Sequence, residues 1–583
     1  MKYHALAEVY DSLENTSKRL GKTHIISEFL KKVPSEALEK ITLLLQGKVY
    51  QEYDERKLGV ASRLVIKALA VSSGESADTI EKKWKKLGDL GDVTKELMSS
   101  KKQATLFSSE LTVNKVFDNL AKLASLTGMG TVDKKVGLIS ELLTSAKALE
   151  AKYIIRTVLE DLRVGVADGT LRDAIVWAYF GEKLKLNYDF KEQKIEPENR
   201  EEYNSTIDLV QGAFDVTNNF GEVAQIAKEK KEKGLEKVDI KIFIPVKVML
   251  GPKEETIGDA LARVGSPCQA EYKYDGFRVE VHKSDGRIEL YTRRLEKVTK
   301  QFPELVNYVR SCVKGDNFIL DAEAVGFDAK TGKYLPFQNV SQRIKRKYDI
   351  ESIAKKLPVE LNVFDILYFN GKNLLQEAFV ERRKILEKIV DSKVKKIKLT
   401  QSIVTSDEKE IEDFYKKSLK DGEEGLMLKK LDAPYKPGAR VGHMVKLKST
   451  METFDLVVVG AEWGEGKRSK WLSSFTIACK SGDDFLELGK VGTGIKEKKE
   501  EGLSFEELTK LLKGLVVSEK GKEVTVKPKV LLEIAFEEIQ KSPSYSSGYA
   551  LRFPRVVRLR EDKSVSEATT LSHIKKVVEG QRK

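Results

Sequence analysis

Residues 271–278 read Glu-Tyr-Lys-Tyr-Asp-Gly-Phe-Arg. Lys273 lies at the end of an apolar and aromatic stretch and is followed by an Asp-Gly turn and an arginine, an arrangement that suits an activated amine. A lysine must lose a proton to attack, and neighbouring cations or desolvation favour that loss. A K-x-D-G match arises by chance in about one chain in seven of this size. The run alone is therefore a weak signal, and the structural alternative is a strand-terminal lysine before a β-turn.

The composition is that of a large protein with several cores. The chain has 583 residues, of which 41% are hydrophobic and 33% charged, with a net charge of +13. A disordered tail is excluded, and a polyanionic partner is favoured. Three isolated cysteines support neither a disulfide framework nor a zinc site. With no apolar run of membrane-spanning length, we expect a cytoplasmic protein that does not bind membranes.

The prolines divide the chain. Only Pro34 and Pro197 of the 13 prolines precede residue 236, which predicts long helices first and strands and turns later. Apolar residues recur at helical spacing over 109–128, between Ser109 as a cap and Gly128. Residues 228–237 form a charged stretch that we interpret as a linker. A hairpin is predicted over 277–290, and short strands after 448 suit a small β-barrel.

The run at 271–278 resembles motif I of the covalent nucleotidyltransferases, which include DNA ligases, RNA ligases and mRNA capping enzymes. Further motifs of that superfamily follow in order: Thr292–Arg294, Leu320–Glu323, Val363–Ile366, Glu424–Lys429, Val445–Lys448 and 551–563. Tyr435–Arg440, Tyr153–Ala174 and the Arg-Glu-Asp-Lys ending at Lys563 resemble ATP-dependent DNA ligases of the archaeal and eukaryotic replicative type. Met444 departs from the tryptophan common in that type, which puts one apolar packing contact in question.

The resemblance covers essentially the whole chain and implies three domains. They are an all-α N-terminal DNA-binding domain over 1–235, an α/β adenylation domain over 236–449 and a C-terminal OB-fold β-barrel over 450–583. The implied activity is the ATP-dependent sealing of 5′-phosphate/3′-hydroxyl nicks in duplex DNA, in replication, repair and recombination. ATP and Mg²⁺ are the implied cofactors, with Mn²⁺ as an alternative metal, and we expect a monomer.

The resemblance also assigns roles to residues. Lys273 is the nucleophile that takes AMP from ATP. Glu323 and Glu424 are hard oxygen ligands for Mg²⁺, and Glu323 also belongs to the nucleotide site. The other expected contacts to the nucleotide comprise cations for the phosphates, an acceptor for the adenine amine, an aromatic ring for stacking and the C-terminal motif. The expected cations are Arg278, Arg293, Lys446 and Lys448, and Arg440 contacts either the nucleotide or the phosphate at the nick. Glu271 is the expected acceptor and Phe364 the expected ring, and the C-terminal motif supplies Arg560, Asp562 and Lys563.

Basic patches indicate where nicked DNA is held by its phosphates. They are Arg343–Lys347, Lys467 with Arg468 and Lys470, and Lys541–Lys563. Each is also compatible with an ordinary solvated face. Gln103, Leu106 and Phe107 are similar to the short sliding-clamp-binding sequence of archaeal ligases, although such an apolar pair also packs readily on its own helices.

Three alternatives remain at this point. An RNA ligase or a GTP-using capping enzyme shares the motifs, but those families generally lack a helical domain of this size. An NAD-dependent ligase carries a cysteine-based zinc module that three isolated cysteines cannot build. A non-catalytic DNA-binding scaffold descended from a ligase has no physical reason to keep Lys273, Glu323, Glu424, Lys446 and Lys448 together.

Overall fold

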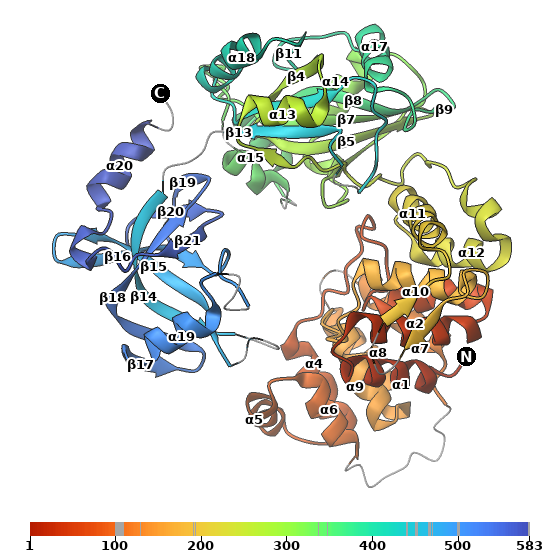
Figure 1. Cartoon of the computed structure of the whole chain (residues 1–583). Helices are drawn as coiled ribbons and strands as arrows, with labels where there is room; N and C mark the ends of the chain where they lie inside the picture. The colour runs from red at the N-terminus through yellow and green to blue at the C-terminus, as the bar shows by residue number, and fades with distance from the viewer. Residues whose placement is uncertain are drawn as a thin grey trace. The chain divides into compact units, whose positions relative to one another are not determined.

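The computed structural model shows helices first, then mixed helices and strands, then mostly strands (Figure 1). It describes residues 1–583 except 100–109, 127, 129, 190, 191, 193, 336, 345, 347, 439, 440, 449–452, 465–467, 469, 498–501 and 581–583. Two compact units divide it: 1–252 with 261–406 and 427–446, and 253–260 with 407–426 and 447–583. The predicted order of an α, an α/β and a β-rich region is confirmed.

The first region is a helical bundle with one small hairpin. Its elements are α1 (Tyr3–Glu14), α2 (Arg19–Lys32), η1 (Ser35–Ala37), α3 (Leu38–Leu45), α4 (Ser62–Ser73), α5 (Ala77–Leu87), α6 (Leu90–Ser99), α7 (Val113–Ser125), α8 (Val132–Ser145), α9 (Ala148–Val158), α10 (Asp168–Phe180), β1 (Asn187–Asp189), β2 (Lys194–Glu196), α11 (Arg200–Thr217) and α12 (Phe220–Leu235). The helix expected over 109–128 is α7, capped by Thr112, whose side chain accepts the Lys115 N–H. Ser109 lies outside the described residues.

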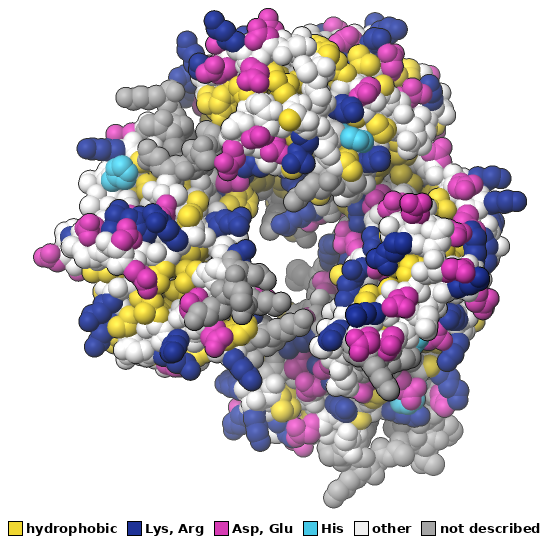
Figure 2. Space-filling model, viewed as in Figure 1, with side chains coloured by type: hydrophobic (Ala, Val, Ile, Leu, Met, Phe, Trp, Pro, Cys, Tyr) yellow, Lys and Arg dark blue, Asp and Glu magenta, His cyan; other side chains and the backbone are white. Residues whose placement is uncertain are grey.

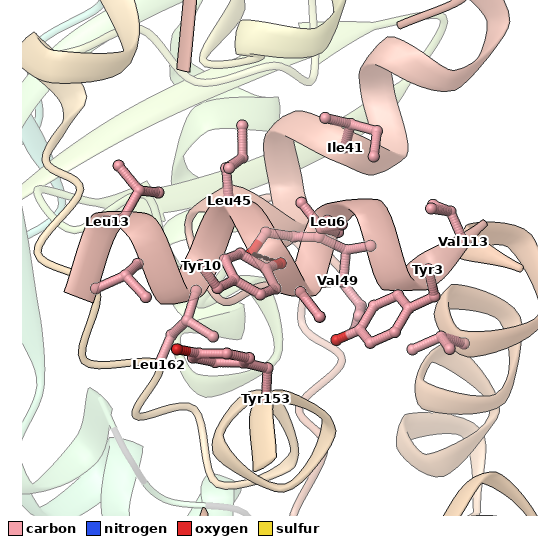
Figure 3. Packing of buried hydrophobic residues seen from close by; sticks show 14 of the residues in the cluster. Tyr3, Leu6, Tyr10, Leu13, Ile41, Leu45, Val49, Val113, Tyr153 and Leu162 are labelled. Carbon is pink, nitrogen blue, oxygen red and sulfur yellow. Dashed lines mark hydrogen bonds between the residues drawn. The ribbon is translucent and has the colours of Figure 1, made fainter. Parts of the chain in front are cut away.

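Helix α1 shows why this region folds. Tyr3, Leu6, Tyr10 and Leu13 recur at helical spacing and are fully buried. They lie along one side of α1, near Ile41 and Leu45 of α3 (Figure 3). The Tyr10 hydroxyl donates to the Leu44 carbonyl at 2.8 Å, so its burial leaves no polar group unsatisfied.

The charged stretch at 228–237 is not the linker that we expected. Residues up to Leu235 belong to α12, which is kinked at Lys231, where φ is +53°. Ala224 and Ala227 are buried before the kink and Leu235 after it, so both parts pack on the helical region. The charges lie on its solvated side.

The second region contains two sheets. Its elements are β3 (Lys253–Glu254), α13 (Ile257–Val264), β4 (Cys268–Lys273), β5 (Phe277–Ser284), β6 (Arg287–Thr292), η2 (Thr299–Gln301), α14 (Pro303–Cys312), β7 (Phe318–Gly326), α15 (Phe337–Ile344), α16 (Ile350–Lys356), β8 (Val359–Phe369), β9 (Lys372–Asn373), α17 (Phe379–Ile389), β10 (Ile397–Leu399), β11 (Ser402–Thr405), α18 (Glu408–Lys420), β12 (Gly425–Lys430) and β13 (Met444–Lys448). One sheet has the order β10-β8-β7-β5-β6, with β9 on β8, and the other β11-β4-β12-β13-β3. The predicted hairpin is β5–β6.

Strand alternation gives the first of these sheets one apolar and one polar face. Phe277, Val279 and Val281 of β5 enter an apolar cluster together with alternate residues of β7 and β8. Successive side chains of a strand point to opposite faces, so Arg278 and Glu280 lie on the other face. Glu323, which is paired in register with Arg278, lies on that face too, so two of the expected site residues share it.

The third region is β-rich. Its elements are β14 (Thr453–Trp463), β15 (Leu472–Ser481), β16 (Asp484–Val491), α19 (Phe505–Lys513), β17 (Val516–Lys520), β18 (Glu523–Ala535), β19 (Glu538–Lys541), β20 (Tyr549–Arg552), β21 (Arg555–Leu559), η5 (Val565–Glu567) and α20 (Leu571–Gly580). A sheet of order β16-β15-β14-β18-β17, with β21 on β18, encloses an apolar cluster containing Phe454, Phe475 and Phe505. Register shifts in β14, β15 and β18 increase the local twist that a barrel needs.

Lysine and arginine side chains are interspersed with acidic ones over the visible surface (Figure 2). Among the described residues, no helix combines the length and the apolar character needed to cross a bilayer.

Candidate active site

Lys273 ends β4, a strand whose preceding five residues are all buried. The chain then turns through Asp275 and Gly276 into β5. A Cβ atom on residue 276 would lie 2.4 Å from the Ala324 carbonyl oxygen, so only glycine fits this turn. The buried strand and the tight turn fix the backbone on both sides of a half-buried amine.

Glu271, two residues before Lys273, is a buried carboxylate held by several donors. Its side chain is 2% exposed, and its Oε2 lies 2.7 Å from the Lys429 Nζ. Gln269 donates to Oε1 at 2.6 Å, and the Arg383 Nη1 lies 3.8 Å from the same oxygen. Because these contacts fix the carboxylate, it can serve as a preorganised hydrogen-bond acceptor.

Phe364 belongs to the same site. The Lys429 Nζ lies 4.7 Å from the centre of the Phe364 ring and 3.4 Å from its carbonyl oxygen. The structure therefore brings the expected stacking ring and the expected adenine acceptor together through one lysine. Lys429 ends the predicted motif at 424–429 but has no role assigned from the sequence, and Arg383 is not predicted at all. The reason is that both of these partners of Glu271 lie more than 100 residues after it.

Arg278 lies within a cluster of buried charges. Its Nη2 is 2.8 Å from Glu280 and its Nε is 2.6 Å from Asp321. Burial raises the pKa of Asp321 to about 6, although Arg278 opposes that rise. Burial also disfavours the charge of Glu280, but hydrogen bonding from His282 and the charge of Arg278 leave its pKa lowered. The guanidinium of Arg278 is thus fixed by two carboxylates.

Glu323 is paired in register with Arg278, on β7, and Arg293 follows directly after β6. Lys446 and Lys448 alternate with buried residues of β13, so they leave the strand on one side. Met444 packs in an apolar cluster with Val246 and Met249, so the contact in question is made by methionine.

Glu424, just before β12, pairs with Lys448. Their Oε2 and Nζ atoms are 2.7 Å apart, and Glu537 lies 3.4 Å from the same ammonium. Burial disfavours the charge of Lys448, but these carboxylates raise its pKa. The described residues contain no group of three His, Cys, Asp or Glu side chains suited to a metal. Mg²⁺ does not require such a group of three, because it is commonly held by one or two carboxylates together with phosphate oxygens and water.

The three residues expected from the C-terminal motif lie together. Arg560 forms two hydrogen bonds of 2.8 Å with Asp562 and another of 2.9 Å with Asp455 of β14. Lys563 contacts the second oxygen of Asp455 at 2.7 Å. Asp455 is not among the residues predicted from the sequence, because it lies 105 residues before Arg560, which it anchors.

Several predicted residues are not placed at the site. Arg440, Gln103, Leu106, Phe107 and Lys467 lie outside the described residues. The DNA-facing role expected for Arg343 is wrong, because its side chain is fully buried and bound to Glu304 and two carbonyls. Arg468 and Arg558 are exposed, and each pairs with a carboxylate, whereas Arg552 is only 21% exposed and pairs with Glu538.

The class of protein follows from three features of this site. They are a lysine at the end of a buried strand, a turn that requires glycine, and a fixed carboxylate near an aromatic ring. These features, on two sheets followed by a β-rich region, are those of a covalent nucleotidyltransferase.

Comparison with known proteins defines the family. Three family models match: "DNA ligase N terminus" over 2–176, "ATP dependent DNA ligase domain" over 248–448 and "ATP dependent DNA ligase C terminal region" over 468–563. The DNA ligase of Nanoarchaeum equitans is 46% identical, covering 100% of this chain and 99% of the relative. The DNA ligase of Thermococcus fumicolans is 43% identical, covering 98% of each.

A solved structure titled "Pmar-Lig_PreS3" has a similar fold, with a TM-score of 0.57 and 18% identity over 95% of this chain and 99% of that one. The chain belongs to the ATP-dependent DNA ligases of archaeal type, which seal nicks through a lysine–AMP intermediate.

Proposed function

We propose that Lys273 is the nucleophile of this ligase. The Nζ atom loses a proton to solvent and bonds to the α-phosphorus of ATP while the bond to the bridging oxygen breaks and pyrophosphate leaves. An oxygen of the 5′-phosphate at the nick then attacks the same phosphorus, and the lysine amine leaves. Finally the 3′-hydroxyl attacks the 5′-phosphorus, forms the phosphodiester and releases AMP. The observation that carries this assignment is the ion pair of Glu271 with Lys429, because Glu271 lies two residues before Lys273 on the same strand, β4.

We further propose that Glu271, Lys429 and Phe364 form the adenine subsite. The amine of adenine donates to the Glu271 carboxylate, which Lys429 and Gln269 keep in place. Phe364 stacks on the base, and the cation beside its ring strengthens that stack. A purine with an oxygen at the same position presents an acceptor to an acceptor and is disfavoured.

Charge on the phosphates is balanced by Arg278, Arg293, Arg440, Lys446 and Lys448 in this proposal. Glu323 and Glu424 would hold Mg²⁺, since single carboxylates of this kind fit a metal that also binds substrate phosphates. Bound Mg²⁺ supplies charge neutralisation for the leaving pyrophosphate. Arg560, Asp562 and Lys563 orient that pyrophosphate.

Nicked duplex DNA is held through its phosphates, and the exposed arginines of the C-terminal region suit that task. Phe553, which follows Arg552, is 66% exposed with a φ of +51°. The Arg552 guanidinium lies 5.4 Å from the centre of its ring, and the exposed remainder of the ring is available to a partner. We also propose that Gln103, Leu106 and Phe107 bind a sliding clamp, that the enzyme acts as a monomer and that it works in the cytoplasm.

The test is intact mass after incubation with ATP and Mg²⁺, followed by nicked DNA. Wild type should gain one AMP and lose it to nicked DNA with a sealed product, whereas Lys273→Ala gains none. Lys430→Ala is the matched control, because that side chain is 44% exposed on the neighbouring strand and pairs only loosely with Asp432. AMP that is gained but not discharged by nicked DNA would favour an RNA substrate, and AMP on Lys273→Ala would refute the nucleophile.

A further inference from the structure

Residues 240–249, here called the strap, lead from α12 towards β3 and form no strand. Three backbone N–H groups of the strap, spaced three residues apart, donate to buried side chains instead of to a sheet. The donors are Phe243, Val246 and Met249, and the acceptors are the His282 Nδ1 at 2.9 Å, the Glu280 Oε1 at 2.7 Å and the Tyr435 hydroxyl at 3.1 Å. The strap is therefore attached by side chains of the nucleotide-binding region.

These acceptors are joined to one another and to Arg278. The Nδ1 of His282 accepts from the strap, so its proton is on Nε2, which donates to Glu280 at 2.8 Å. Glu280 pairs with Arg278, Arg278 pairs with Asp321, and the Tyr435 hydroxyl donates to Asp321 at 3.1 Å. A continuous set of contacts thus leads from the strap to the arginine expected to face the nucleotide.

Phe243 is held in a strained conformation at the start of this chain of contacts. Its φ is +72°, which a phenylalanine rarely adopts. The Tyr291 hydroxyl donates to its carbonyl at 2.9 Å, and the Arg287 guanidinium lies 4.2 Å from its ring centre. Strain that is retained by several contacts usually marks a functional position.

The helical region binds the strap at residues between those three donors. The Asn218 side chain donates to the Pro245 carbonyl at 2.5 Å, and the Lys247 N–H donates to the Asp215 carbonyl at 3.2 Å. The Lys247 ammonium also lies 3.0 Å from Asp168. The helical region therefore contacts the strap directly, on both its backbone and its Lys247 side chain.

We propose that His282 and Glu280 are positioning residues that couple the strap, and through it the helical region, to Arg278 of the nucleotide site. The proposal rests on the role assigned above to Arg278. Neither residue touches the nucleotide. Glu280 fixes one side of the guanidinium, and His282 sets the orientation of Glu280 according to where the strap lies.

Two isosteric variants separate the two contacts of the imidazole. His282→Asn keeps an acceptor near the place of Nδ1 and loses the donor to Glu280, whereas His282→Gln keeps a donor near the place of Nε2 and loses the acceptor for the strap. Two single-turnover rates are measured on each purified full-length variant. One is lysine–AMP formation over a range of ATP concentrations without DNA, and the other is discharge of preformed lysine–AMP on nicked DNA.

The coupling predicts that the more impaired variant differs between the two assays. His282→Asn loses the donor to Glu280, which fixes Arg278, so it should lose at least tenfold more than His282→Gln in kcat/KM for ATP. His282→Gln loses the acceptor for the strap, which the helical region contacts, so it should lose at least fivefold more than His282→Asn in discharge on nicked DNA. Val281→Ala is the control for destabilisation, because its side chain lies on the apolar face of the same strand. It should lower the melting temperature without changing the ratio of the two rates.

Equal losses of both variants in both assays, or no loss in either, would overturn the coupling. Arg278→Gln separates the role of Arg278 at the nucleotide from the coupling through His282. If Arg278→Gln forms lysine–AMP normally, the assigned role of Arg278 is wrong. If Arg278→Gln is impaired and the His282 variants follow Val281→Ala, only the coupling is wrong.

Discussion

Replacing Lys429 by Met leaves the Glu271 carboxylate buried without its nearest cation. The two side chains are 7% and 2% exposed and their charged atoms are 2.7 Å apart. Removing one partner of such a pair costs about 3–5 kcal/mol. Gln269 and the more distant Arg383 remain near Glu271, so we expect a loss towards the lower end of this range.

A loss of about 3 kcal/mol corresponds to a fall of about 6–12 °C in the melting temperature of a domain of 150–250 residues. The variant Lys429→Met/Glu271→Gln removes both charges, so it should recover more than half of that fall. Catalysis should not recover, because glutamine no longer offers a carboxylate to the adenine amine. The loss of that charged hydrogen bond, about 1.5–3 kcal/mol, predicts a decrease of at least tenfold in kcat/KM for ATP.

Thermal unfolding and lysine–AMP formation measured on the two variants and on Lys430→Met provide the test. Lys430→Met should match wild type in both measurements, since its ammonium is exposed. The reasoning is refuted if Lys429→Met melts and takes up AMP like wild type, or if the double variant regains ATP use along with stability.

Three further predictions concern other parts of the chain. Burial raises the pKa of Asp215 from 3.8 to about 6, so the folded state keeps a proton that the unfolded chain loses. The free energy of unfolding of wild type should therefore fall by up to about 3 kcal/mol as the pH rises from below 3.8 to above 6. Asp215→Asn should lack that loss, and parallel stability curves would contradict this account. Asp455→Asn should raise the KM for ATP at least threefold, because Asp455 anchors Arg560 and Lys563. The sealing of a pre-adenylated nick involves no pyrophosphate, so the same change should affect it less. Equal effects on both reactions would refute the role of Arg560 and Lys563 at the pyrophosphate. Phe107→Ala should reduce clamp-stimulated joining to the unstimulated level, and stimulation that persists would exclude Phe107 as a clamp contact.

The order of regions and many of the strands were predictable because their signals are local. Alternation of Phe277, Val279 and Val281 followed by a Gly-containing turn predicted β5 and β6, and both are present. The charged stretch that ends α12 was mispredicted as a linker, because charge on the solvated side of a helix looks the same in sequence as charge in a loop.

The same distinction applies to the basic residues. Arg343 and Arg346 belong to one basic run, yet Arg343 is fully buried against Glu304 whereas Arg346 is 41% exposed. Sequence supplies the charge of a segment but not its long-range partners. Those partners decide whether a cation faces DNA or stabilises the interior.

By itself, the sequence determined the chemistry: a lysine before an Asp-Gly turn, with the ordered motifs that resemble nucleotidyltransferases. Only the tertiary structure placed Lys429 beside Glu271, Asp455 beside Arg560, and the strap on His282 and Glu280. The physical reason is that a motif is set by neighbours along the chain. A buried charge, in contrast, must be satisfied by whichever partner the packing of distant strands brings within about 3 Å.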